Sequence, residues 1–237
     1  ADAGTSGETR GLAVQPACIG RIWFEIMIVG KAAGIQKRYQ GVSGITLGNQ
    51  IAQVVQELEN TRVATVSHPL YPNALDSLPC IIGSFSSGNY PSAFPDTCLL
   101  KGSIGTLPGE DHEGVKQSLV DKVATAAAKD SWMKDHPPEV RFVGFDAEAS
   151  HIPVDHPIVA TLCKNFKEIT GRDPEISGRQ GAADTRFLNS YGETPTVIFG
   201  PGSSDIMHSN DEYVPIDDYL TAIKITALSI ADWCGLE

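Results

Sequence analysis

The order of apolar and amphipathic segments between residues 20 and 148 constrains the fold more than any other feature of the chain. Four runs there are rich in β-branched and aromatic residues, as strands are, and two segments space their apolar side chains as helices do. The strands are expected at 22–29, 80–85, 97–104 and 139–145, and the helices at about 43–58 and 108–128. A β-α-β-β-α-β order is typical of the ferredoxin-like fold. We therefore expect one α+β domain over residues 20–148.

Beyond residue 148 the chain shows a second pattern, in which helices alternate with short strands. The expected helices cover about 157–170 and 216–234, and the strands lie near 174–177 and 196–199. Such alternation predicts a parallel or mixed sheet with helices packed on it, as in α/β proteins. Two or three strands are too few for a complete domain, so we expect an incomplete α/β domain.

The charge balance restricts the partners. The chain has 237 residues and a net charge of −11, which argues against nucleic acid or an anionic membrane as a partner. No segment is apolar over a length that would cross a bilayer, and Ala1 does not open a signal peptide. The five cysteines are scattered, without a C-x-x-C pair, and are expected to be reduced thiols. These features predict a cytoplasmic protein.

The most distinctive loop follows the strand expected at 196–199. It begins with Gly200, Pro201 and Gly202, and it carries His208 among acidic residues. Glycines let a ligand approach the backbone closely, and an imidazole with neighbouring carboxylates suits a zinc site. The alternative is that His208 is an ordinary loop histidine that binds only water or a carbonyl group.

Several motifs along the chain resemble, in the same order, those of the zinc-dependent amidohydrolase and exopeptidase family of acetylornithine deacetylase, succinyl-diaminopimelate desuccinylase and the aminoacylases. These motifs are ADAGTSGE (1–8), VGKAA (29–33), SAFPD (92–96), PGE (108–110), GAADTR (181–186), GPG (200–202) and HSNDE (208–212). The resemblance runs from end to end of the chain. It implies an α/β zinc-peptidase catalytic domain, here incomplete, that is interrupted by an inserted ferredoxin-like lid and dimerisation domain. The catalytic domain would comprise residues 1–19 and 149–237, and the lid residues 20–148.

The resemblance also implies roles for individual residues. Glu8 and His208 would be zinc ligands, and the backbone from Gly200 to Gly202 would lie beside the substrate. Arg186 would bind a substrate carboxylate, which a planar guanidinium can bind through two parallel hydrogen bonds. Without the resemblance, Glu8 would be interpreted as a solvated terminal carboxylate and Arg186 as a surface arginine. For Asp184 we favour a helix N-cap over a substrate contact.

The chain departs from the family pattern in ways that bear on activity. The family mechanism uses two zinc ions that share a water molecule, with a Glu that transfers the proton. The His-x-Asp and Glu-Glu motifs that it needs are absent from this sequence, and the half that supplies them is expected to precede Ala1. The lid histidine after Gly-Lys-Ala-Ala is replaced by Gly34, and the Pro that usually follows the ligand Glu by Thr9. No catalytic residue is therefore assigned.

Two functions remain open on this basis. The first is a hydrolase, dependent on zinc or on cobalt in its place, that cleaves an amide bond in an N-acyl amino acid or peptide. It would form a homodimer through its lid and be inactive as this partial chain. The alternative is a non-catalytic relative or fragment that acts as a dimerisation or binding module through the exposed edge of the lid sheet.

Overall fold

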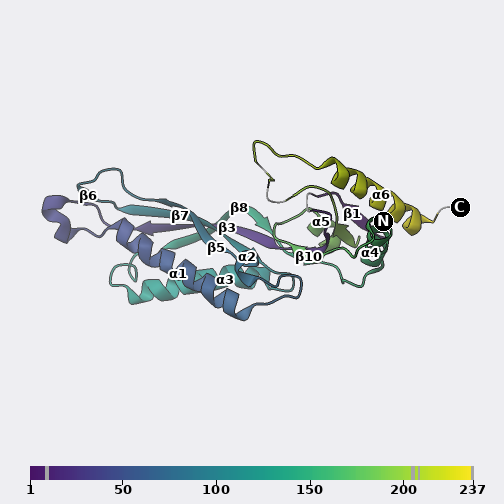
Figure 1. Ribbon diagram of the computed structural model, residues 1–237. Coiled ribbons are helices and arrows are strands. Elements are labelled where there is room, and N and C mark those ends of the chain that lie inside the picture. Colours follow the sequence, from purple (N-terminus) through teal and green to yellow (C-terminus); the bar gives the residue numbers. More distant parts are fainter. Residues whose placement is uncertain (9–10, 204–205, 208, 236–237) are drawn as a thin grey trace. The chain divides into compact units, whose positions relative to one another are not determined.

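The computed structural model describes residues 1–8, 11–203, 206–207 and 209–235 (Figure 1). These residues divide into two compact units. Unit 1 comprises Ala1–Ile19, Pro69–Tyr71 and Ala149–Glu237, and unit 2 comprises Gly20–His68 and Pro72–Glu148. Apart from Pro69–Tyr71, unit 2 covers the range expected for the lid. The function of this unit as a lid and dimerisation domain stays a prediction.

Unit 2 contains the six expected elements in the expected order. They are β3 (Gly20–Val29), α1 (Gly44–Thr65), β5 (Cys80–Ser86), β7 (Thr97–Thr106), α3 (His112–Lys129) and β8 (Glu139–Ala147). The sheet is antiparallel throughout, with strand order β5-β7-β3-β8, which is the ferredoxin-like arrangement. Smaller elements fill the connections: β4 (Ala33–Gly34), the 3₁₀ helix η1 (Ile35–Gln40), α2 (Ala74–Ser77) and β6 (Ala93–Phe94).

The core of unit 2 lies between the sheet and its two long helices. Alternate residues of β3 are buried, so every second side chain of that strand faces the helices. They pack against apolar residues that recur at helical spacing along α1 and α3. The buried set includes Ile22, Phe24, Ile26 and Ile28 of β3, Leu47, Ile51, Val55 and Leu58 of α1, and Leu119, Val123 and Ala127 of α3.

Both helices of unit 2 differ from the expected bounds, for one shared reason. Helix α1 continues to Thr65, and α3 begins at His112, so the Pro-Gly-Glu segment before it is a turn and not helix. Arg62 of α1 is buried and donates to the Gly105 carbonyl at 2.7 Å and to both carboxylate oxygens of Glu110 at 2.8 Å. An apolar pattern does not reveal such a buried polar bond, so the extra turns of α1 were not predicted.

Unit 1 holds a mixed sheet, as expected. In its described part the strands are β1 (Gly4–Ser6), β2 (Val14–Cys18), β9 (Ser150–His151), β10 (Ile176–Arg179) and β11 (Thr196–Ile198). Their order is β1-β11-β2-β10, and β9 pairs with β2. The β1/β11 and β2/β10 pairs are parallel, whereas β11 and β2 are antiparallel. Helices α4 (Pro157–Thr170) and α6 (Ile216–Cys234) supply apolar side chains to the same core, and α5 (Thr185–Ser190) follows the Gly-rich loop after β10.

The described helices include none that is both long enough and apolar enough to cross a membrane. All five cysteines are free.

Candidate functional site

The loop after β11 lies directly against the residues that follow β1. The Phe199 amide donates to the Ser6 carbonyl at 3.0 Å, and the Leu12 amide donates to the Gly200 carbonyl at 2.9 Å. A methyl group on Gly200 would collide with the backbone of Glu8, so only glycine fits at this point. The structure thus brings together Glu8 and the Gly200–Gly202 loop, which are nearly two hundred residues apart in sequence.

Glu8 forms an ion pair with a residue that the sequence analysis did not single out. Its Oε2 lies 3.0 Å from Nη2 of Arg179, at the end of β10. The exposed fraction of the Arg179 side chain is 11%, and that of Glu8 is 31%. Glu8 is therefore not the freely solvated carboxylate of the alternative interpretation. The signal that could have indicated Arg179 is a lone arginine at the point where a short strand enters a Gly-rich loop.

Arg186 is mostly buried, and its guanidinium contacts residues close to it in sequence. It lies in α5, where its Nη1 donates to the Ala183 carbonyl at 3.2 Å and its guanidinium lies 4.0 Å from the centre of the Phe187 ring. Its exposed fraction is 13%, which excludes the surface-arginine interpretation. Asp184 occupies the N-cap position of α5, as expected, but its side chain makes no capping bond and its carboxylate lies 3.3 Å from Nη1 of Arg186.

The remaining predicted ligand, His208, lies outside the described residues. Pro201 and Gly202, which precede it in the loop, are described, and Gly202 has a positive φ of 83° that suits glycine. Zinc favours carboxylate and imidazole ligands, and Glu8 beside a loop that leads to His208 has that donor chemistry. The donor set fits zinc to this extent. Further ligands are needed to complete a site.

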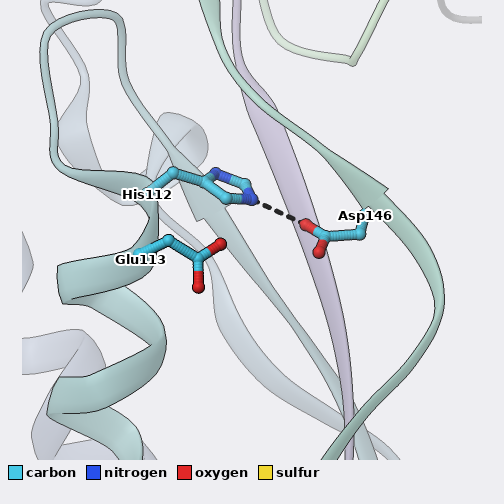
Figure 2. A group of neighbouring side chains, drawn as sticks. All are labelled: His112, Glu113 and Asp146. Carbon is cyan, nitrogen blue, oxygen red and sulfur yellow. Dashed lines mark hydrogen bonds and ion pairs between the residues drawn. The ribbon is translucent and has the colours of Figure 1, made fainter.

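One group of side chains in the described residues has the spacing of a metal site, and it lies in unit 2. His112, Glu113 and Asp146 place one ligand atom each within 4.8 Å of one another, and Nε2 of His112 lies 2.6 Å from Asp146 (Figure 2). Nζ of Lys116 lies 2.6 Å from Glu113 and 2.5 Å from Asp146. An ammonium group therefore already lies between the two carboxylates, where a metal ion would have to bind.

The pKa shifts of Asp146 and Lys116 also indicate ion pairing within this cluster. Burial alone would raise the pKa of Asp146, but hydrogen bonds from Lys116 and His112 outweigh burial and lower that pKa. Burial alone would lower the pKa of Lys116, but its bonds to Asp146 and Glu113 outweigh that effect and raise it. Each partner thus keeps the other charged. We interpret the cluster as an ion-pair network that fastens the start of α3 to β8.

The family model described as peptidase family M20/M25/M40 matches residues 11–232. The chain belongs to this family. The M20/M25/M40 family comprises metal-dependent amidohydrolases and peptidases that act on C–N bonds. The family identification made from the motifs is thereby confirmed. Glu8 precedes the matched range, so its assignment as a ligand depends on its motif and on its position beside Gly200.

Curated relatives of the chain are about twice its length. It is 28% identical over 206 residues to N-formyl-4-amino-5-aminomethyl-2-methylpyrimidine deformylase of Halalkalibacterium halodurans, covering 83% of this chain and 47% of that protein. It is 26% identical over 196 residues to acetylornithine deacetylase of Aliivibrio fischeri, covering 82% and 48%. The chain therefore spans about half the length of the curated relatives that it matches.

Solved structures share its fold. Aminopeptidase PepT from Bacillus cereus matches with a TM-score of 0.74 at 18% identity, over 99% of this chain and 58% of that one. A metallo-carboxypeptidase of the M20 family from Sulfolobus solfataricus matches with a TM-score of 0.70 at 15% identity, over 97% and 63%. At such identities the likeness supports the M20 fold.

Proposed function

We propose that the chain is part of a metal-dependent hydrolase that cleaves an amide bond in a small N-acyl amino acid or peptide. The observation that carries the proposal is the position of Glu8 against the Gly200–Gly202 loop, which leads to His208. A carboxylate and an imidazole from these two segments would bind zinc, or cobalt in its place. The bound metal would supply an acidic water molecule and polarise the amide carbonyl.

The other residues of the site would bind the substrate. The backbone of Gly200, Pro201 and Gly202 would lie beside the substrate, since these residues carry little side-chain bulk. Arg186 would recognise a carboxylate next to the scissile bond. In a metal-replete, full-length form of the protein, replacing Arg186 by Lys should weaken carboxylate substrates by about a few kcal/mol at most and leave esterified analogues unaffected. Equal losses on both kinds of substrate would show that Arg186 does not recognise that group.

Metal binding tests the proposal directly. Zinc affinity of the purified protein is measured for the wild type, Glu8→Gln, His208→Ala and a control, Glu175→Gln, whose exposed side chain lies in the same unit. We expect the first two variants to bind zinc more weakly and the control to match the wild type. Equal affinity in all four proteins would refute the proposed ligands.

Turnover is expected to need more than these residues. The sequence lacks His-x-Asp and Glu-Glu, so the general base and the bridging carboxylate are missing. Proton transfer by such a base typically contributes about 100- to 10,000-fold to the rate. We expect no chelator-sensitive hydrolysis of N-acetyl amino acids by the 237 residues alone. Hydrolysis that is lost in His208→Ala would contradict this expectation.

A dimerisation or binding module remains the second candidate, and Gly34 favours it. This residue in β4 occupies the position of the family's lid histidine, and no atom lies within 4 Å of the place where its Cβ would be. The fold does not require glycine there, so steric need does not explain the loss of the histidine. A homodimer formed through an edge of the unit 2 sheet would elute at twice the chain mass and bind no zinc.

A further inference from the structure

Most of the Arg179 side chain is buried, and its set of hydrogen bonds is incomplete. Its guanidinium reaches Glu8 through Nη2, while Nε is buried and has no hydrogen-bond partner among the described residues. Burying a guanidinium is costly unless a partner of opposite charge offsets the loss of water. Glu8 is that partner, so the positive charge of Arg179 is offset by this one carboxylate.

The end of β10 is fixed so that Arg179 stays in place. The Tyr71 ring lies against Gly178, and any Cβ at that position would collide with the ring. The Tyr71 hydroxyl donates to the Arg179 carbonyl at 3.2 Å, and the Gly178 amide donates to the Leu70 carbonyl at 2.9 Å. The backbone that carries Arg179 is therefore held from one side by a segment distant in sequence.

The Glu8 carboxylate is held by only one of its oxygens. Oε2 forms an ion pair with Nη2 of Arg179 at 3.0 Å, and no ion pair to Oε1 is found among the described residues. A carboxylate that binds a metal through one oxygen is commonly oriented by a hydrogen bond to the other. The backbone of Glu8 also packs closely against Gly200, which restricts the conformations open to Glu8.

We propose that Arg179 is a positioning residue for Glu8. It binds Oε2, fixes the orientation of the carboxylate, and leaves Oε1 to bind a metal ion. This inference rests on the proposed function, in which Glu8 is a metal ligand, and it adds a residue outside the metal-ligand and substrate-binding set predicted from the motifs. Loss of such a partner typically lowers metal affinity by about 10- to 100-fold.

The test compares metal binding by matched variants of the purified protein. Zinc affinity is measured by competition with a chromophoric chelator for wild type, Arg179→Met, Arg179→Lys and Glu8→Gln. The control is Arg172→Met, since Arg172 is exposed, lies in unit 1 and stacks on Phe166 at 5.0 Å. The visible spectrum of bound Co²⁺ is recorded for each protein, because it reports ligand geometry and not overall stability.

We expect Arg179→Met to weaken zinc binding about 10- to 100-fold and to shift the Co²⁺ spectrum, with Arg172→Met like the wild type. Arg179→Lys keeps the charge and should recover part of the affinity. It also serves as the informative variant if Arg179→Met does not fold. In the double variant, Glu8→Gln and Arg179→Met should be strongly non-additive, because they act on one ligand.

Three outcomes would overturn the inference. If Glu8→Gln weakens zinc binding while both Arg179 variants match the wild type, Glu8 is a ligand but Arg179 does not position it. If Arg179→Met binds zinc more tightly, Arg179 competes with the metal for the carboxylate. If Glu8→Gln itself has no effect, the proposed ligand is wrong and the inference fails with it.

Discussion

The buried pair between Arg62 and Glu110 allows a quantitative test of how unit 2 is held together. Exposed fractions of these side chains are 7% and 14%, and Arg62 donates to both carboxylate oxygens of Glu110 at 2.8 Å. Glu110 also accepts from the Leu107 amide at 2.6 Å. Replacing Glu110 by Ala removes both contacts and leaves a buried guanidinium with the Gly105 carbonyl as its remaining hydrogen-bond partner among the described residues.

Breaking a buried ion pair from one side typically costs about 3–5 kcal/mol, because the remaining charge is left without a partner. We expect Glu110→Ala to lower the free energy of unfolding of unit 2 by an amount in that range. Glu110→Gln should cost less, since the amide oxygen still accepts one bond. The measurement is chemical denaturation, followed by fluorescence of Trp23 and Trp132, which both lie in unit 2.

A surface ion pair in the same unit provides the control. Arg141 and Glu139 lie 2.7 Å apart, but their side chains are more than half exposed. Exposed pairs contribute little to stability. Glu139→Ala should therefore unfold at nearly the wild-type denaturant concentration. If Glu110→Ala and Glu139→Ala lower the free energy of unfolding equally, the buried Arg62–Glu110 pair stabilises unit 2 no more than an exposed pair does.

Three further predictions follow from particular positions. Gly34→His should leave the thermal midpoint unchanged, since open space surrounds its Cβ position, and a clear drop in the midpoint would contradict that description. Gly178→Ala should lower the midpoint because its methyl group would strike the Tyr71 ring, and a midpoint equal to that of the wild type would contradict this contact. The pKa of Asp146 is lowered on folding, so its stabilisation is complete above the ordinary value near 3.8 and is lost as the pH falls through the lowered folded value. Asp146→Asn should therefore flatten the acid limb of a stability–pH curve, whereas an unchanged limb would show that the bond from Lys116 contributes no net stability.

The sequence predicts unit 2 well because its apolar pattern and its polar surface agree. It predicts β1 and β2 poorly. All five residues of β2 are buried, including Gln15 and Pro16, so neither alternation nor an unbroken apolar run marks the strand. This strand is recognisable only once its neighbours β10 and β11 are in place.

Only those residues of the candidate site that belong to a recognisable sequence motif were predicted. Glu8 and Gly200 come from motifs distant in sequence, and the fold places them together. Arg179 could not be found in this way, because its importance depends on burial and on a partner that lies more than 170 residues away. Asp184 occupies the N-cap position of α5 as its residue type predicts, but its carboxylate lies beside the Arg186 guanidinium and makes no capping bond.

The pairing of the unit 1 sheet has a consequence for synthesis on the ribosome. Almost all of unit 2 is one continuous stretch, so it can fold soon after residue 148 has emerged. Gly4, by contrast, pairs with Thr196, and Gln15 with Ile198. At about 5–20 residues per second, β1 waits roughly 10–40 s for β11 to be made, whereas β2 meets β9 and β10 before that. During that interval the backbone groups of β1 lack their partner strand and are open to other chains, so this strand of the nascent protein is exposed to misassembly.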